Sequence, residues 1–363
     1  MRITRAARLA RKVIQRTSTE QLFLRSGLNL TKPNDIRATL TERCNYRCIY
    51  CHHWRQESYT DEMSLEEWKS AFSSIRDFLG RFAVQFLGGE PMLVPWFADL
   101  VRFCSEIGID WGVITNGSSL SSARVEALVA ADPLNIDISL DSRDASAHDY
   151  LRGIRGSMQH VSEGVHRLVE ARRRAGARFA IRIKATVTRQ TVEGLGEIVT
   201  WAETMPSVVV DFGPVRLRRE KDIADMYPAG PEEMARLERQ IEQLIERKQM
   251  GAPIETSVSK LRGMATHFRR EPLSHGVGSC RVGLRSIDIR PNGDVDHCFK
   301  FKRIGNLREA SMRQIWTGQA HREVVDQTVA CPLFETTCAM TCLAHRSLRQ
   351  DIARGVRLIR SKS

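Results

Sequence analysis

Three cysteines on one short stretch are the residues whose type and spacing point most directly to chemistry. Cys44, Cys48 and Cys51 stand at C-x3-C-x2-C spacing. Three thiolates on one loop can hold three irons of a cubane [4Fe–4S] cluster, and the fourth iron then has no protein ligand. A structural iron–sulfur or zinc site normally has four protein ligands. The spacing therefore predicts a cluster with one iron open to a small molecule.

A second motif, Gly88-Gly89-Glu90-Pro91, follows the next strand-like segment. Adjacent glycines let the backbone approach a ligand closely, and a carboxylate beside them can bind an ammonium group. By itself this tetrapeptide is typical of an ordinary turn. Its position one strand after the three cysteines makes a binding function a more specific interpretation.

In the order and placement of these two motifs, the chain resembles the radical S-adenosylmethionine (SAM) superfamily. The resemblance implies that the open iron binds SAM and that one electron from the cluster cleaves SAM to a 5′-deoxyadenosyl radical, which abstracts hydrogen from a substrate. An external one-electron donor such as flavodoxin or ferredoxin is then required. The implied SAM contacts are Tyr50 beside adenine, Gly88, Gly89 and Glu90 at the ammonium group, Asn116 lining the pocket, Ser139 and Asp141 at the ribose or carboxylate, and Arg152 near the carboxylate.

Ordinary structural roles stay open for several of these residues. Ser139 and Asp141 could end a strand, and Arg152 could cap a helix. Lys184 and Thr186 could face either the pocket or the outer helices. The stretch from Cys48 to His52 also matches the haem-attachment pattern C-x2-C-H, but that interpretation leaves Cys44 and the Gly-Gly-Glu-Pro motif unexplained.

Five further cysteines lie near the C-terminus: Cys280, Cys298, Cys331, Cys338 and Cys342. Their spacing resembles the auxiliary-cluster extension called SPASM, or its shortened form Twitch, although the full SPASM pattern has seven cysteines. Two four-thiolate clusters need eight ligands, so we expect one auxiliary iron–sulfur cluster, held by Cys280, Cys298 and at least one of Cys338 and Cys342. The spare thiol, with Cys331 as a candidate, could stay free or donate hydrogen to a substrate radical. Zinc held by four thiolates is the structural alternative.

Hydrophobic periods of two and 3.6 residues alternate along the first two thirds of the chain. Strands are predicted at 35–41, 82–87, 110–115, 134–140, 178–186 and 207–212, and helices at 64–80, 95–107, 119–130, 157–175 and 191–204. This alternation predicts an α/β fold, a partial (β/α)6 TIM-like barrel, with functional loops at the C-terminal ends of the strands. A small α+β cysteine-rich domain should follow, with a β-hairpin turning at Asn292-Gly293.

The expected domain organisation has five parts. They are a basic N-terminal helical segment at 1–34, a radical SAM core at 35–215, a helical bridge at 216–279, an auxiliary-cluster domain at 280–345 and a basic tail at 346–363. The bridge is not expected to contribute to the active site. The N-terminal helix should pack on the core, and a membrane-surface or targeting role is its alternative.

Composition limits the number of domains, the class of partner and the location of the protein. The 363 residues suffice for roughly two domains of about 150 residues each. The charge of +12, from 55 Lys and Arg against 43 Asp and Glu, favours polyanionic partners without choosing among them. No apolar run approaches the ~20 residues of a membrane span, and no signal peptide is present, so we expect a cytoplasmic protein. Clustered cysteines indicate metal sites instead of a secreted disulfide framework.

The predicted reaction is hydrogen abstraction from a small polar substrate, sugar-like or nucleotide-like, leading to oxidation or epimerisation. About 35 residues precede the first strand, too few for a folded leader-peptide-binding domain, and this favours a metabolite. A peptide-modifying enzyme of the kind that matures ribosomal peptides is the alternative. A zinc-bearing nucleic-acid-binding protein would not explain the Gly-Gly-Glu-Pro motif, so nucleic acid is not favoured as a partner. An iron–sulfur electron carrier would not explain a three-ligand site.

Overall fold

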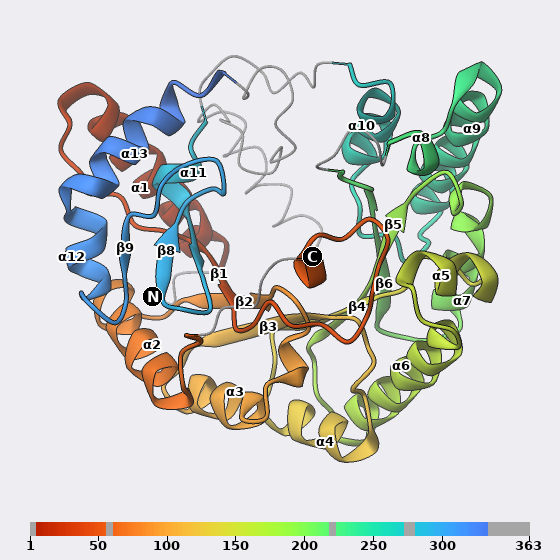
Figure 1. The fold of residues 1–363 in the computed structure, drawn as a ribbon, viewed down its shortest axis with the longest axis horizontal. Helices are drawn as coiled ribbons and strands as arrows, with labels where there is room; N and C mark the ends of the chain where they lie inside the picture. The colour runs from red at the N-terminus through yellow and green to blue at the C-terminus, as the bar shows by residue number, and fades with distance from the viewer. Residues whose placement is uncertain (1–4, 56–60, 218–222, 272–279, 333–363) are drawn as a thin grey trace.

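A computed structural model of the chain describes residues 5–55, 61–217, 223–271 and 280–332. The strands of these residues form one curved nine-stranded sheet in the order β6-β5-β4-β3-β2-β1-β7-β8-β9. Helices α2 to α7 follow the outer side of the sheet (Figure 1).

The first six strands pair in parallel, each with its neighbour in the sequence. They are β1 (Asp35–Thr39), β2 (Ala83–Leu87), β3 (Asp110–Thr115), β4 (Asn135–Ser139), β5 (Ala180–Val187) and β6 (Val208–Pro214). The intervening helices are α2 (Leu65–Leu79), α3 (Phe97–Glu106), α4 (Ser122–Ala130), α5 (Ala145–Arg152), α6 (Ser157–Arg174) and α7 (Leu195–Glu203), and the short 3-10 turns are η1 (His53–Arg55), η2 (Pro91–Leu93) and η3 (Val192–Gly194). The predicted partial barrel is confirmed, and α5 is a helix that the periodicity did not predict.

The two faces of the sheet differ in polarity. In β5, Ile181, Ile183, Ala185 and Val187 are buried towards the helices, and they alternate with the half-exposed side chains of Arg182, Lys184 and Thr186. On the helix side, rings of Phe72, Phe86, Phe97 and Trp111 meet edge to face in succession and join α2, β2, α3 and β3. The apolar core therefore lies between the sheet and its helices, and the concave inner face is polar.

The predicted hairpin is confirmed, but it does not form a sheet of its own. β7 (Ser286–Ile289) and β8 (Asp294–Asp296) pair antiparallel, and Gly293 has a φ of +88° in the turn. β9 (Gly305–Asn306) pairs with β8. β7 pairs in parallel with β1, so it covers what would otherwise be the open edge of the barrel sheet.

The N-terminal helix packs on this C-terminal part of the chain. α1 (Arg5–Ser26) buries the Glu20 carboxylate, which accepts two hydrogen bonds of 2.6 Å from Arg285. Phe23 packs against Leu284 and Val325, which belong to α11 (Val282–Arg285) and α13 (Gln319–Val329); α12 (Met312–Thr317) lies between these helices in the sequence. Among the described residues, no helix combines the length and the apolar character that crossing a bilayer requires.

The helical bridge covers the other edge of the barrel sheet. It contains α8 (Ile223–Met226), α9 (Gly230–Gln249) and α10 (Val258–Phe268). Val210 N donates to Pro253 O, and Glu255 N donates to Val210 O, both at 2.8 Å. The Thr256 hydroxyl then accepts a hydrogen bond of 2.6 Å from Phe212 N. The bridge therefore reaches the sheet beside β6.

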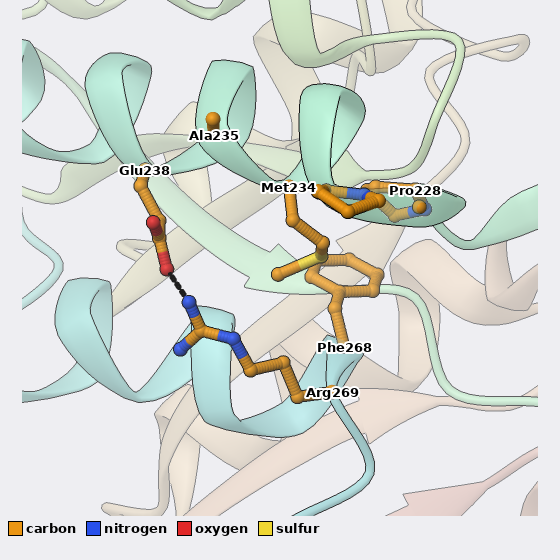
Figure 2. A pocket seen from close by; sticks show the side chains of 8 residues that line it. Pro228, Met234, Ala235, Glu238, Phe268 and Arg269 are labelled. Atoms are coloured by element: carbon orange, nitrogen blue, oxygen red, sulfur yellow. Dashed lines mark hydrogen bonds and ion pairs between the residues drawn. The ribbon is translucent and has the colours of Figure 1, made fainter.

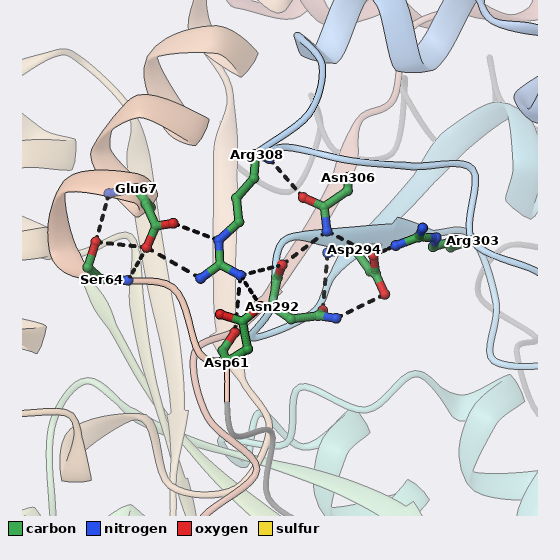
Figure 3. Close-up of polar contacts among 8 residues, drawn as sticks. All are labelled: Asp61, Ser64, Glu67, Asn292, Asp294, Arg303, Asn306 and Arg308. Atoms are coloured by element: carbon green, nitrogen blue, oxygen red, sulfur yellow. Dashed lines mark hydrogen bonds and ion pairs between the residues drawn. The ribbon is translucent and has the colours of Figure 1, made fainter.

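Arg308 ties the loop after β9 to the start of α2 (Figure 3). Its guanidinium donates to Glu67 Oε1 and to Asp61 Oδ2, each at 2.6 Å. Ser64 and Glu67 form the capping box that the sequence indicates at this helix start. The hydrogen bonds from Arg308 and from the Ser64 backbone lower the pKa of Glu67 to about 2.

Replacing Arg308 by Ala should raise the pKa of Glu67 towards its usual value of about 4.3. A carboxyl whose folded pKa is depressed contributes stability above its unfolded pKa, and that stability is lost as the pH falls through the folded pKa. We therefore expect Arg308→Ala to shrink the loss of unfolding free energy between about pH 5 and about pH 3. Urea titrations at the two pH values measure it. Arg102→Ala, which removes an exposed ion pair with Asp99 on α3 and leaves Glu67 untouched, is the control; an equal change in both variants contradicts the assignment.

Candidate active site

The turn after β2 holds the first half of the cysteine loop. Gly89 N donates to Thr41 O at 3.0 Å. A Cβ on Gly89 would lie 2.1 Å from Arg43 O, and one on Gly88, whose φ is +120°, would lie 2.5 Å from the Thr39 side chain. The two glycines thus permit a close approach to the Thr39 side chain and to the backbone of the cysteine loop, whereas the sequence led us to expect a ligand at this position.

The C-terminal end of α5 holds the second half of the loop. Arg47 N donates to Arg152 O at 3.2 Å, and Ile49 N donates to Leu151 O at 3.0 Å. Gly153, in the left-handed conformation that ends α5, passes so close that a Cβ would lie 2.6 Å from Arg47 O. The carbonyls of Leu151 and Arg152 have no hydrogen-bond partner within α5, because they belong to its last turn, and the backbone N–H groups of the cysteine loop bind them instead.

Two of the three predicted thiols accept a hydrogen bond from another side chain, and Cys44 also accepts one from a backbone N–H. Cys44 Sγ accepts one from Tyr46 N at 3.4 Å and one from Asn116 Nδ2 at 3.7 Å. Cys48 Sγ accepts one from Arg152 Nη1 at 3.9 Å. These donors favour the thiolate form that an iron ligand needs.

The structure places Cys44, Cys48 and Cys51 near one another on the loop. Burial raises the pKa of each thiol, to about 11 for Cys48, and the charge of Cys51 raises the pKa of the other two as well. No three Cys, His, Asp or Glu side chains of the described residues converge on a point that could hold a single metal ion. Ligands of a cubane each bind a different iron, so three neighbouring, separate thiols suit a cluster.

Glu90 lies beneath the loop with its carboxylate fully buried. Oε1 accepts hydrogen bonds from Thr115 Oγ1 at 2.8 Å and from Met92 N at 3.2 Å, and Oε2 accepts one from Asn116 N at 2.7 Å. Burial raises the pKa of Glu90, and the three donors oppose that rise. The carboxylate therefore fixes Asn116, whose side chain contacts Cys44.

Asp141 joins two other predicted residues, Tyr50 and Arg152, to Thr186 of β5. Its Oδ2 accepts from Tyr50 OH at 2.6 Å, and its Oδ1 accepts from Arg152 Nη2 at 2.7 Å and from Thr186 N at 2.9 Å. The Arg152 guanidinium also lies 5.6 Å from the centre of the Tyr50 ring. Burial alone would raise the pKa of Asp141, but the charges of Arg152 and His148 hold it below its ordinary value.

Ser139, Lys184 and Thr186 lie on the inner face of the sheet. Ser139 ends β4 in register with Lys184, and Thr186 is two residues farther along β5. All three side chains are half-buried. The sequence left open whether Lys184 and Thr186 face the pocket or the outer helices. The alternation of burial along β5 shows that both side chains point away from the helices, towards the inner face.

Sequence reasoning missed the carboxylate that precedes the cysteines. Glu42 is almost fully buried, and its Oε2 is paired with His53 Nδ1. Its Oε1 has no hydrogen-bond partner among the described residues. Glu42 also adds negative charge near Cys51 and raises the pKa of that thiol. No period or spacing in the sequence singled it out, since its burial depends on how the loop folds back.

The structure gathers three of the five C-terminal cysteines. Cys280, Cys298 and Cys331 pack together with Val282. Cys338 and Cys342 lie outside the described residues, as does the whole of the expected basic tail.

Two further ionisable side chains are buried outside this site. Arg281, next to Cys280, is buried, and burial lowers its pKa. Cys104 is buried in α3, as expected for a packing thiol, and burial raises its pKa to about 12.

A cavity of about 460 Å³ lies elsewhere, between α9 and α10 (Figure 2). Its lining residues are Pro228, Gly230, Pro231, Met234, Ala235, Glu238, Phe268 and Arg269. Glu238 and Arg269 form an ion pair across it. It contains none of the predicted site residues, so we assign it no part in the active site.

Family models cover both parts of the chain that carry cysteines. Residues 39–184 match the model of the radical SAM superfamily. Residues 280–342 match SPASM, an iron–sulfur cluster-binding domain. The predicted cofactors, SAM with its [4Fe–4S] cluster and an auxiliary iron–sulfur cluster, agree with these two domains.

Curated relatives match over most of the chain. An AdoMet-dependent heme synthase of Methanosarcina barkeri is 26% identical over 293 residues, which are 78% of this chain and 82% of the relative. A PqqA peptide cyclase of Rhizobium meliloti is 25% identical over 294 residues, 78% of this chain and 73% of the relative. SuiB of Streptococcus suis, in its crystal structure with S-adenosylmethionine, superposes with a TM-score of 0.66 at 18% identity, covering 92% of this chain and 75% of SuiB, which shows the same fold.

Removing the Arg152 guanidinium should destabilise the cysteine loop strongly. Arg152→Met leaves the buried carboxylate of Asp141 without its cation, and breaking a buried ion pair in this way costs about 3–5 kcal/mol of unfolding free energy. Urea denaturation of the protein without clusters measures the loss. The matched control is Arg173→Met, which removes an exposed ion pair with Glu170 on α6 and should change stability little. Equal losses in the two variants would show that the buried pair does not hold the loop.

Proposed function

The chain is a radical SAM enzyme with a SPASM-type domain, and from this premise we propose that it abstracts hydrogen from a peptide and thereby modifies it. The observation that carries the proposal is the set of three thiols on one loop, Cys48 buried and Cys44 and Cys51 half-buried, clamped between the turn after β2 and the end of α5. Loaded with its cluster and SAM, such a site supplies a 5′-deoxyadenosyl radical to a bound substrate.

A peptide substrate has more support than the small polar substrate expected from the sequence. A PqqA peptide cyclase matches most of the chain, and a sporulation killing factor maturation protein of Bacillus subtilis matches 42% of it at 28% identity. The nucleotide-converting relative, a probable GTP 3′,8-cyclase, matches only 36% of this chain. None of these relatives supports a sugar substrate.

Cys44, Cys48 and Cys51 hold the catalytic cluster in this proposal. Asn116 and Arg152 donate hydrogen bonds to two of these thiolates, which orients them and offsets part of their negative charge. The buried carboxylate of Glu90 binds Asn116, and that of Asp141 binds Arg152. A one-electron donor such as flavodoxin or ferredoxin supplies the electron.

The SAM contacts divide into two groups. Gly88 and Gly89 shape the pocket by letting the loop approach β2, and Glu90 adds a carboxylate beneath it. Tyr50, Asp141 and Arg152 already bind one another, so they form the wall of the pocket as a unit. Ser139 keeps its hydroxyl on the open inner face, where it can reach the ribose.

The auxiliary cluster takes Cys280, Cys298 and Cys331 as three of its four ligands. This changes the sequence-based assignment, in which Cys331 was a candidate for the spare thiol, because Cys331 packs with the other two. Either Cys338 or Cys342 supplies the fourth ligand, and the other is the spare.

The triple variant Cys44→Ala/Cys48→Ala/Cys51→Ala should form no 5′-deoxyadenosine from SAM under anaerobic reduction, because its cluster has lost all three ligands. Liquid chromatography of the quenched reaction measures the product. Cys104→Ala, which removes a buried thiol of α3, should keep cleaving SAM and is the control. Cleavage by the triple variant would refute the assignment.

The substrate class is tested with the same wild-type protein. A pooled synthetic peptide library is expected to give SAM-dependent mass changes in individual peptides, read by mass spectrometry. Pooled nucleotides and sugars are expected to give none. Products that arise only in the second pool would overturn the peptide proposal while leaving the radical chemistry in place.

Iron content separates one auxiliary cluster from two. The reconstituted wild-type chain should bind roughly eight irons, and the triple variant roughly four. Colorimetric iron analysis against protein concentration measures both. About eight irons retained by the triple variant would contradict a single C-terminal cluster.

A further inference from the structure

One row of side chains crosses the inner face of the sheet from the cysteine loop to β6. Ser139 is in register with Lys184, and Lys184 with Asp211. Asn116 directly follows β3, and Thr115, the last residue of β3, is in register with Ile138, the residue before Ser139. Neighbouring strands lie about 4.8 Å apart, so Asp211 stands roughly 10 Å from Ser139 along this row. The row begins at Asn116, which contacts Cys44, and ends at Asp211, two strands beyond the expected SAM contact Ser139.

Lys184 and Asp211 form an ion pair that solvent reaches. Their side chains are 36% and 22% exposed. Lys184 Nζ is paired with Asp211 Oδ2, and the Thr256 hydroxyl donates to Asp211 Oδ1 at 2.8 Å. Burial alone would raise the pKa of Asp211, but Lys184 and Thr256 hold it below its ordinary value. Asp211 is therefore an ionised acceptor with a fixed orientation.

Two other cations of the inner face each contact more than one carboxylate oxygen. Arg37 binds both carboxylate oxygens of Asp288, at 2.7 and 2.9 Å. Arg182 binds Asp137 at 2.7 Å and Glu255 at 3.2 Å. An ammonium group carries three donors, and within the described part of the chain the structure shows one partner for that of Lys184. Lys184 and Asp211 also lie one row nearer the cysteine loop than Arg182 does.

We propose that Lys184 and Asp211 bind one residue of an extended peptide substrate, with Lys184 donating to its carbonyl oxygen and Asp211 accepting from its N–H. A neighbouring cation and anion match such a residue, because in an extended chain the N–H and C=O of one residue point to the same side. A carboxylate would be attracted by Lys184 and repelled by Asp211, and an amine would meet the reverse. The inference rests on the proposed peptide-modifying function and names the residues that would bind the peptide backbone.

The experiment uses acetyl-tetraalanine amide as the probe, with the reconstituted enzyme and SAM. Saturation-transfer-difference NMR detects weak binding of such a peptide. Lys184→Met and Asp211→Asn should each weaken binding roughly tenfold, since each removes the charge that strengthens one of the two proposed hydrogen bonds. Lys69→Met removes an ion pair with Glu66 on the outer surface of α2 and should leave binding unchanged. Succinate and putrescine, as carboxylate and amine probes, should not compete with the peptide.

Three results would overturn the inference: no saturation transfer to the peptide with wild-type enzyme, equal binding by wild-type enzyme and both site variants, or displacement of the peptide by succinate or putrescine. Iron content and circular dichroism check that the variants fold, and Lys184→Gln replaces Lys184→Met if the latter does not. SAM cleavage by the same wild-type sample is measured in parallel. Its absence counts against the proposed function, whereas SAM cleavage with variant-independent peptide binding counts only against the amide site.

Discussion

Backbone hydrogen bonds on both sides of the cysteine loop are the constraint on which the site depends. The turn after β2 binds the loop at Thr41, and the last carbonyls of α5 bind it at Arg47 and Ile49. Glycines stand at both contacts because a Cβ would collide with the loop backbone, at 2.1 Å for Gly89 and 2.6 Å for Gly153. Three thiols on a free loop would lose much conformational entropy on binding a cluster. Here folding of the barrel itself positions them.

Two buried carboxylates extend this constraint from the backbone to the side chains. Burying a charge is costly unless it is paired or hydrogen-bonded. Glu90 meets this condition with three donors from η2, from β3 and from the residue after β3, and Asp141 meets it with Tyr50, Arg152 and Thr186. Each network includes a residue that donates to a cysteine sulfur. The same interactions that make burial of the carboxylates tolerable therefore also orient the donors around the thiols.

Local patterns predicted much of this arrangement, and non-local contacts account for what they missed. Hydrophobic periods predicted the six strands, and Asn-Gly predicted the hairpin, because both signals reside in adjacent residues. The pairing of β7 with β1 joins segments some 250 residues apart, as in Asp35 with Ser286, and has no local signature. Gly89 was recognised as a close-approach residue, but its partner was not. Glu42 escaped notice because only the folded loop buries it.

The pairing of β7 with β1 gives the inner face a single rigid frame. Four register pairs join the strands, and Arg37 crosses them to bind both oxygens of Asp288. At the opposite edge, Thr256 holds Asp211 in place from outside β6. Sites carried on strands keep their geometry better than sites carried on loops. A substrate lying on this face would therefore meet Lys184, the cysteine loop and the C-terminal hairpin at separations that the sheet maintains, although these parts are far apart in the chain.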